Sequence, residues 1–303
     1  MMSQDRTSFI ASLIVLVTGV LWGFYWLPVR AMVDRGLPGG WGTIAATAVA
    51  ALVLLPVAWR RRDEIRAAGP VALGSIAVGG AAFALYSIGL VYGRVAIIIL
   101  LYFLTPVWST LIARFVMGWH TPALRVVAIA VGILGLLVML GAGGEVPMPR
   151  GAGEWLALVA GVLWAVGTTG IRAKSTLGPA PATFVFALGA LLAAALTTPF
   201  FSGWPGDLAA QADAGLVAIA LLAGAGWWGL SLCALMWATL RLDPARVGIL
   251  MQTEVLVGAL SAALLAGEHL APLEIVGGAL VVSAGVLEVW PVRRRRAQVA
   301  SGR

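Results

Sequence analysis

The sequence has few charged residues and almost no cysteine or histidine. Of its 303 residues 11% are charged and 61% hydrophobic, with a mean hydropathy of +0.98. Water-soluble domains carry about 25% charged residues, so a soluble fold is excluded. The single cysteine, Cys233, excludes an internal disulfide and a thiolate cluster. His120 and His269 are far apart and have no acids or thiols at the spacing of a closed metal site, so we expect no metal or cofactor.

Long apolar stretches bounded by charge, proline or glycine make up most of the chain. A spanning helix needs about 20 mostly apolar residues. The pattern predicts ten such helices, at 9–29, 41–59, 70–92, 95–117, 122–142, 152–171, 181–201, 214–239, 245–266 and 272–290. The predicted fold class is therefore an all-α, polytopic membrane protein. The first stretch is too long for a signal-peptide core, so we expect it to be retained.

The basic residues are distributed unevenly over the two sides of these spans. If the N-terminus is inside, inner segments hold all of the 20 Lys and Arg residues except Arg30, Arg35, Arg94 and Arg150. This bias is the positive-inside signal and predicts two cytoplasmic termini. The tail 292–303 is expected to act as a topology anchor beside anionic lipid. Because the bases form no stripe on a folded face, nucleic acid is not an expected partner.

Sequence strings recur between the two halves of the chain. Gly-Val-Leu-Trp occurs at 19–22 and 161–164, and a Gly-x-His pattern occurs at 118–120 and 267–269. These matches predict two five-helix repeats, 1–143 and 151–291. Five helices is an odd number, so the second copy enters the membrane from the opposite side. Such inverted repeats are typical of secondary transporters, in which two nearly equivalent packings permit alternating access to a central site.

These motifs, with Leu-Thr-Pro-Val at 104–107, Gln-Thr-Glu-Val at 252–255 and Gly-Glu-His at 267–269, resemble the drug/metabolite transporter superfamily of the type with two EamA repeats. Within it the chain is similar to bacterial inner-membrane exporters of aromatic amino acids. The resemblance implies a basket of ten helices around a central cavity. It is incomplete: the family commonly has a proline after the helix-9 acid, where this chain has Val255, and the first repeat has Thr105 in place of the acid before Pro106.

Glu254 is the acid expected deepest in the membrane, ten residues into the predicted helix 245–266. An ionisable side chain at that depth costs several kcal/mol unless it is neutral, paired or hydrated, and is a functional candidate by default. It can titrate a proton or bind a substrate ammonium group. Alternatively, it is a protonated acid that hydrogen-bonds across helices and only supports packing. Gln252 is a second candidate, although successive helical residues point about 100° apart and the two cannot line one cavity equally.

The predicted helix 95–117 carries a polar stripe at helical spacing that should face inward, formed by Tyr102, Thr105, Pro106 and Ser109. Pro106 cannot donate to the carbonyl of Tyr102, so we expect a kink and either a free acceptor for an ammonium group or a satisfied structural kink. Aromatic rings that can hold a substrate, or else only fill the core, complete the candidate site. They are Trp22, Tyr86, Trp164, Trp227 and Trp228, with Ser231 beside them.

Motifs for catalysis and nucleotide binding are missing. Gly224, Gly226 and Gly229 spell GxGxxG, but the segment lies inside a predicted membrane helix and not after a strand, so it indicates close helix packing. GxxxxGK[ST], GxSxG and HExxH are absent. We therefore expect neither an enzyme nor an ATP-driven pump.

These features predict a secondary transporter that exports amino acids, aromatic and other apolar ones above all, across the bacterial inner membrane. A proton antiporter and a substrate-gradient facilitator both fit a lone central acid. An exporter of hydrophobic organic cations is the alternative, and a membrane receptor or assembly protein is a remote one. The expected partners are the small-molecule substrate, the lipid bilayer and, for an antiporter, protons, and we expect a monomer in preference to a homodimer.

Overall fold

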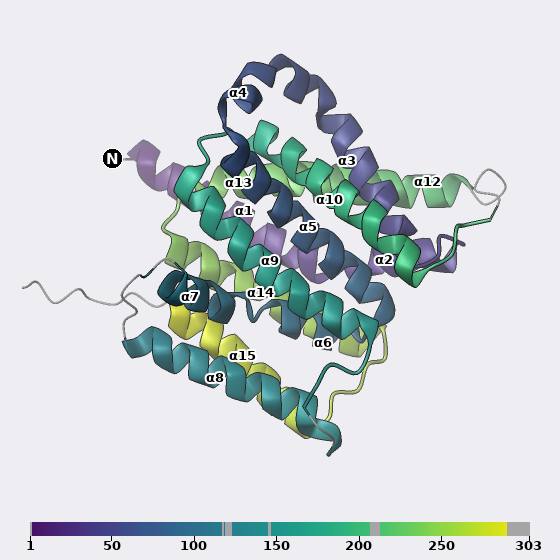
Figure 1. The fold of residues 1–303 in the computed structure, drawn as a ribbon, viewed down its shortest axis with the longest axis vertical. Coiled ribbons are helices and arrows are strands. Elements are labelled where there is room, and N and C mark those ends of the chain that lie inside the picture. Colours follow the sequence, from purple (N-terminus) through teal and green to yellow (C-terminus); the bar gives the residue numbers. More distant parts are fainter. Residues whose placement is uncertain (1, 117, 119–122, 145–146, 207–212, 290–303) are drawn as a thin grey trace, which may run out of the picture.

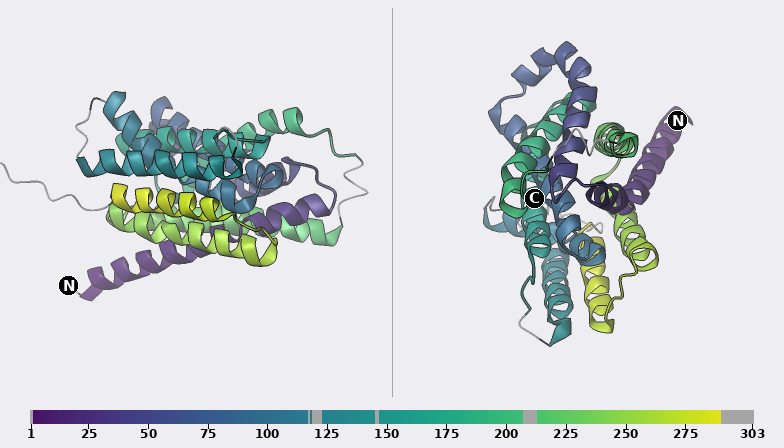
Figure 2. Two further views of the ribbon diagram at one scale, coloured as in Figure 1. Left: turned by 90° about the horizontal axis from the view of Figure 1, so that it is seen from below. Right: turned by 90° about the vertical axis from the view of Figure 1, so that its right-hand side faces the viewer.

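The computed structural model describes residues 2–116, 118, 123–144, 147–206 and 213–289. Predictions on His120, on the tail 292–303 and on the last residue of the tenth predicted helix lie outside this range. The described residues form helices and no strands, which confirms the all-α prediction. Figures 1 and 2 show the helices packed as a bundle, with the N-terminal part of α1 projecting from it.

Most predicted helices are found close to their predicted bounds. The α-helices are α1 (Met2–Gly23), α2 (Trp26–Asp34), α3 (Trp41–Arg60), α4 (Arg62–Ala67), α5 (Pro70–Tyr92), α6 (Val95–Tyr102), α7 (Thr105–Phe115), α8 (Ala123–Leu140), α9 (Ala152–Lys174), α10 (Pro179–Phe201), α12 (Ala214–Leu221), α13 (Leu232–Thr239), α14 (Pro244–Leu265) and α15 (Pro272–Val289). A 3₁₀ turn, η1 (Gly141–Gly143), follows α8, and a π-helical segment, η2 (Leu222–Ser231), joins α12 to α13.

Three of the predicted spans are interrupted. The first is divided into α1 and α2 at Phe24 and Tyr25, and continues to Asp34 instead of ending near residue 29. The fourth is divided into α6 and α7 just before Pro106. The eighth contains the wider π-helical turns of η2, a geometry that is rare and often found at functional sites. The sequence pattern predicted a kink at Pro106, but not the interruption at Phe24 and Tyr25 or the π-helical turns of η2.

Nine of the ten predicted spans have helices long and apolar enough to cross a membrane, among the described residues. The exception is the tenth, whose apolar helix Pro272–Leu287 is shorter than the other nine. The chain is therefore a multi-pass membrane protein by length and composition. Its outward-facing side chains agree, because many large apolar residues are exposed on the bundle surface, for example Leu52, Leu192 and Leu264.

The helices pack in pairs, with α5 against α9 and α10, α8 against α15, α3 against α10, and α1 against α14. Between α8 and α15 the backbones approach closely at Gly135 and Gly277. A Cβ at Gly135 would lie 2.7 Å from the carbonyl oxygen of Gly277, and a Cβ at Gly277 would lie 2.6 Å from that of Gly135. Small residues permit such contacts between membrane helices. The same holds for Gly224 of the GxGxxG string, where a Cβ would meet the carbonyl oxygen of Ala46 at 2.5 Å.

The two ends of the bundle can be named by their arginines. The Arg30 end contains the end of α2, the start of α6 and the segment between α14 and α15, joined by hydrogen bonds of Arg30 and Arg94. The Arg61 end contains α4 and the beginning of α1. By the positive-inside prediction the Arg30 end is the outer one.

Candidate functional site

A buried carboxylate lies at the centre of the candidate site. Glu254, on α14, is 1% exposed and is the only charged residue among the buried residues of the described chain. The hydroxyl of Tyr86, on α5, donates to its Oε1 at 3.2 Å. None of the five ion pairs formed by the described residues includes Glu254. A buried carboxylate without a cation is costly, so the site can accept a proton or a positively charged group.

Tyr86 also stacks on a second tyrosine. Its ring lies 4.5 Å from that of Tyr102, with an interplanar angle of 29°. Tyr102 is the last residue of α6 and is 4% exposed. Its hydroxyl is buried and has no hydrogen-bond partner among the described residues. A buried hydroxyl without a partner costs about 1–3 kcal/mol, which makes it a candidate ligand for a substrate.

An aromatic cluster surrounds the two tyrosines, with Phe83 of α5 at its centre. The ring of Phe83 lies 4.8 Å from Trp22, 4.9 Å from Trp164 and 5.3 Å from Phe186. Trp228 joins the cluster at 5.8 Å from Trp22. These rings come from α1, α5, α9, α10 and η2, so both halves of the chain contribute. Edge and offset arrangements of this kind suit a bound apolar side chain or an ammonium group.

The polar atoms of this cluster are mostly paired with each other. The indole N–H of Trp22 donates to Ser231 Oγ at 3.0 Å, and Ser231 in turn donates to the carbonyl of Trp227 at 2.5 Å. Trp228 donates to the hydroxyl of Tyr25 at 2.7 Å. The indole N–H of Trp227 donates to the carbonyl of Leu21 at 2.8 Å. These bonds fix the ring positions, so the aromatic surfaces are preorganised.

Tyr25 and its neighbours extend the network towards the Arg30 end. The Tyr25 hydroxyl lies 3.0 Å from Ser87 Oγ, which lies 2.7 Å from Thr43 Oγ1. All three residues are fully buried. The network connects α3 and α5 with the turn between α1 and α2, close to the aromatic cluster.

The structure corrects one expectation about helix α6–α7. The carbonyl of Tyr102 is not free, because the Thr105 hydroxyl donates to it at 2.7 Å and lies 3.3 Å from the carbonyl of Gly161. The helix is interrupted at Phe103 and Leu104, so the structure has two separate helices where a kink was expected. Thr105 thus supplies the donor that Pro106 lacks. Of the two expected outcomes, the structure therefore has the one in which the carbonyl at the kink is already hydrogen-bonded.

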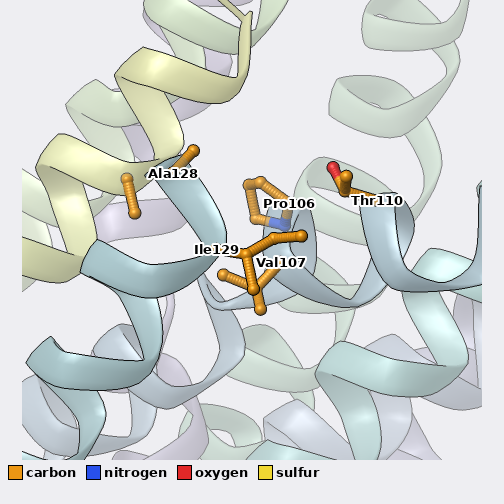
Figure 3. A pocket seen from close by; sticks show the side chains of 6 residues that line it. Pro106, Val107, Thr110, Ala128 and Ile129 are labelled. Carbon is orange, nitrogen blue, oxygen red and sulfur yellow. The ribbon is translucent and has the colours of Figure 1, made fainter. Parts of the chain in front are cut away.

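Pro106 and Gln252 lie away from the Glu254 carboxylate and its tyrosines. Figure 3 shows Pro106 in a small pocket with Val107, Thr110, Ala128 and Ile129, on the side of α7 that faces α8 and α15. Gln252 lies against α15, where a Cβ on Gly285 would be 2.5 Å from its Nε2 atom. Its Oε1 atom is buried without a partner among the described residues. Among the described residues no hydrogen bond joins Pro106 or Gln252 to the Glu254 side chain, whose partner is Tyr86.

Three aromatic members of the cluster were missed by sequence reasoning: Tyr25, Phe83 and Phe186. Tyr25 follows Trp22 by three residues, and Phe83 precedes Tyr86 by three, so both share a helix face with a predicted site residue. That spacing was the available signal. Phe186 lies in a helix with no other site residue, and only the packing of α10 on α5 reveals it.

Metal ligands are not grouped in the described residues, where no three His, Cys, Asp or Glu residues lie close enough to hold an ion. The ion pairs of the described residues lie at the bundle ends. Arg30 lies 5.5 Å from the ring centre of Trp26, whose N–H donates to Ser261 at 2.9 Å. The site is therefore aromatic and carries one acid, without a buried base in the described part of the chain.

Comparison with known protein families gives a match for the first half of the chain. Residues 9–141 match the EamA-like transporter family. Two proteins named threonine/homoserine exporter RhtA, from Salmonella typhimurium strains SL1344 and LT2, are each 31% identical over 170 residues. The match covers 55% of this chain and 55% of each exporter, so the chain spans about half the length of the curated relatives it matches.

A solved crystal structure of another protein shares the fold over most of the chain. It superposes with a TM-score of 0.59 at 19% sequence identity, covering 91% of this chain and 95% of the other. This likeness concerns the fold alone. It extends beyond residues 9–141 and includes the second half of the bundle.

Proposed function

We propose that the chain is a secondary transporter, and not an enzyme, that exports amino acids across the bacterial inner membrane, because residues 9–141 match the EamA-like transporter family. The observation that carries this proposal is the buried carboxylate of Glu254 between tyrosines and an aromatic cluster. The carboxylate binds the ammonium group of the substrate. The rings of Trp22, Phe83, Trp164 and Trp228 hold its side chain.

The similarity to proteins named threonine/homoserine exporters supports amino acids as the substrate class. The aromatic lining favours aromatic and other apolar amino acids within that class. A zwitterion at this site pairs its ammonium group with Glu254 and leaves its carboxylate to the Tyr102 hydroxyl, which has no partner among the described residues. Monomeric operation suits this arrangement, because the cluster is complete within one chain.

We assign alternating access to two inverted five-helix repeats, 1–143 and 151–291, with both termini cytoplasmic. Helix packing supports the repeat: α3 packs on α10, and α8 packs on α15. In the proposed repeat these are the second and seventh, and the fifth and tenth, spans. A helix can contact its own symmetry mate only near the symmetry axis, so both pairs would lie close to the axis of the proposed repeat.

Export of hydrophobic organic cations is the second candidate function. Glu254 has no cationic partner among the described residues, so a permanent cation would neutralise it directly. Such a cation has no carboxylate of its own, so its site needs no donor like the Tyr102 hydroxyl. Competition between the two substrate classes separates the candidates.

The test is flux into proteoliposomes that contain only the purified protein. Labelled threonine, phenylalanine and tryptophan are supplied with and without an imposed pH gradient, and protein-free liposomes are the control. Saturable flux of phenylalanine and tryptophan is expected, and stimulation by the pH gradient would identify a proton antiporter. Transport of a lipophilic cation without any amino-acid flux would replace the first candidate by the second. Absence of both fluxes would favour a receptor or assembly protein.

A further inference from the structure

Ion pairs between separate parts of the chain gather at one end of the bundle. Among the described residues three pairs join different elements: Arg30 with Glu268, Arg35 with Asp213, and Arg94 with Glu274. All three lie at the Arg30 end. The other two pairs, Arg61 with Glu64 and Arg66 with Asp63, are between residues three apart at α4. At the Arg61 end α1 and α14 are joined by a hydrogen bond from Arg246 to Ser8 at 3.3 Å.

Glu268 has three hydrogen-bond partners at the Arg30 end. It lies between α14 and α15, and its side chain is 9% exposed. Its carboxylate accepts from the backbone N–H groups of Val95 at 2.7 Å and Ala96 at 3.1 Å, and from Arg30 at 3.3 Å. Helix α6 has no side-chain cap from its own N-cap residue. Glu268 therefore caps α6 from a distant part of the chain, where its charge is favoured by the helix dipole.

Arg30 and Arg94 extend this junction to the neighbouring helices. Arg30, on α2, donates to the carbonyls of Leu90 at 3.2 Å and Gly93 at 2.9 Å, at the end of α5. Arg94 donates to Glu274 at 2.6 Å and to the carbonyl of His269 at 2.5 Å. The ends of α2, α5, α6 and α15 are thus joined by a few charge-assisted bonds. Such bonds are roughly twice as strong as neutral ones.

The residues beneath this junction are closely packed. Met32, Leu90, Val95 and Ile98 are each at most 1% exposed, so the Arg30 end is sealed above the aromatic cluster. Helix α6 connects the junction to the site, because its first residues bind Glu268 and its last residue is Tyr102.

From this geometry we infer that Glu268, held by Arg30 and the N-terminus of α6, is the outer latch of the transporter. The inference rests on the proposed function and its membrane orientation. In the closed state the latch holds α6 against α2 and α5, so the aromatic cluster is shut off from the outside. Conversion to the outward-open state separates Glu268 from Arg30 and from Val95, and moves α6 together with Tyr102. Glu268 thus controls exposure of the site without touching the substrate.

Thiol labelling tests the latch without requiring transport. Cys233 is the only cysteine, so Cys233→Ser gives a cysteine-free background. Ser87→Cys then reports on the cluster, because Ser87 is fully buried, close to the aromatic rings and bonded to Tyr25. A membrane-impermeant methanethiosulfonate reagent is added to the outside of intact cells. Slow labelling is expected with the latch intact, and labelling about tenfold faster in Glu268→Gln, since the neutral amide loses the charge-assisted bonds.

Glu64→Gln is the matched control, because it neutralises an ion-paired glutamate at the Arg61 end. Its labelling rate should equal that of the reporter alone. Arg30→Gln is the second latch variant, used if Glu268→Gln does not yield folded, monodisperse protein. Fast labelling of the intact-latch reporter, an unchanged rate in folded latch variants, an equal increase in Glu64→Gln, or an increase only from the cytoplasmic face would each overturn the latch. A failed amino-acid flux with faster labelling would overturn the proposed substrate and leave the latch standing.

Discussion

The two helical segments that bring polar side chains towards the aromatic cluster differ in continuity. The first ends as α6 at Tyr102 and restarts as α7 at Thr105, whereas α14 runs unbroken from Pro244 to Leu265. In the proposed repeat, Thr105 and Pro106 correspond to Glu254 and Val255. Proline in the first segment removes a backbone donor, and valine in the second retains it.

This difference decides what the preceding polar side chain can do. In the first segment the Thr105 hydroxyl is bonded to the carbonyl of Tyr102, the acceptor that Pro106 cannot serve. In α14 the backbone needs no such repair, so the Glu254 side chain reaches across to Tyr86. One polar position thus maintains the backbone, and its counterpart is available to a substrate. In the proposed repeat, the different hydrogen bonds of Thr105 and Glu254 follow from one proline.

The largest expected effect comes from placing a proline in α14. Val255→Pro removes the N–H that Val255 donates within the helix and introduces a ring clash, and the Glu254 side chain is bonded to Tyr86 and not to the orphaned carbonyl. A proline inside a helix costs about 3 kcal/mol or more. We expect the free energy of unfolding to fall by this amount. Denaturant titration of the protein in detergent measures it. Pro106→Ala is the control and should change stability by about 1 kcal/mol or less, because Thr105 already supplies the donor. Equal losses in both variants would contradict the comparison.

The second effect concerns the two polar neighbours within α14. In the proposed function the charge of Glu254 binds the substrate ammonium group; Glu254→Gln removes that charge, and one such charged hydrogen bond contributes about 2 kcal/mol. The expected loss in amino-acid flux is therefore about 30-fold in proteoliposomes. Gln252→Leu is the matched control. Its flux should stay within about twofold, because the Gln252 oxygen is buried without a partner and the side chain lies against α15. A larger loss in Gln252→Leu than in Glu254→Gln would exchange their roles.

Sequence reasoning reached the all-α membrane fold and most of the helix bounds because apolar length is written directly in the chain. It also singled out Glu254, since an acid inside a long apolar run is unusual. It predicted that Pro106 would disturb its helix, but not that Thr105 would satisfy the Tyr102 carbonyl. That bond depends on the rotamer of one hydroxyl, and spacing alone does not specify it.

The wider site could not be predicted because its members come from several helices. Phe83 contacts rings on α1, α9 and α10, and its spacing from Tyr86 indicates a shared helix face but not which rings that face meets. Glu268 looked like part of a repeat motif, and its role as the cap of α6 appears only when distant segments are placed together. Helical periodicity assigns a residue to a face, whereas the partner of that face is decided by tertiary packing.

The smallest expected effect is a difference in stability between variants of the two stacked tyrosines. Tyr86→Phe removes the donor to Glu254 and leaves the carboxylate less satisfied, so unfolding stability should fall by about 1 kcal/mol. Tyr102→Phe removes a buried hydroxyl without a partner, so stability should be unchanged or higher by about 1 kcal/mol.

Transport should respond differently from stability in the Tyr102 variant. Both variants keep the stacked rings, so any change in flux reports on the hydroxyls. If the Tyr102 hydroxyl binds the substrate carboxylate, Tyr102→Phe raises the KM for amino acids by about fivefold, which is about 1 kcal/mol, although the protein is no less stable. An unchanged KM would show that this hydroxyl is an unsatisfied packing group. Such a result would leave Glu254 and Tyr86 as the polar contacts of the site, and would favour a substrate recognised by its positive charge alone.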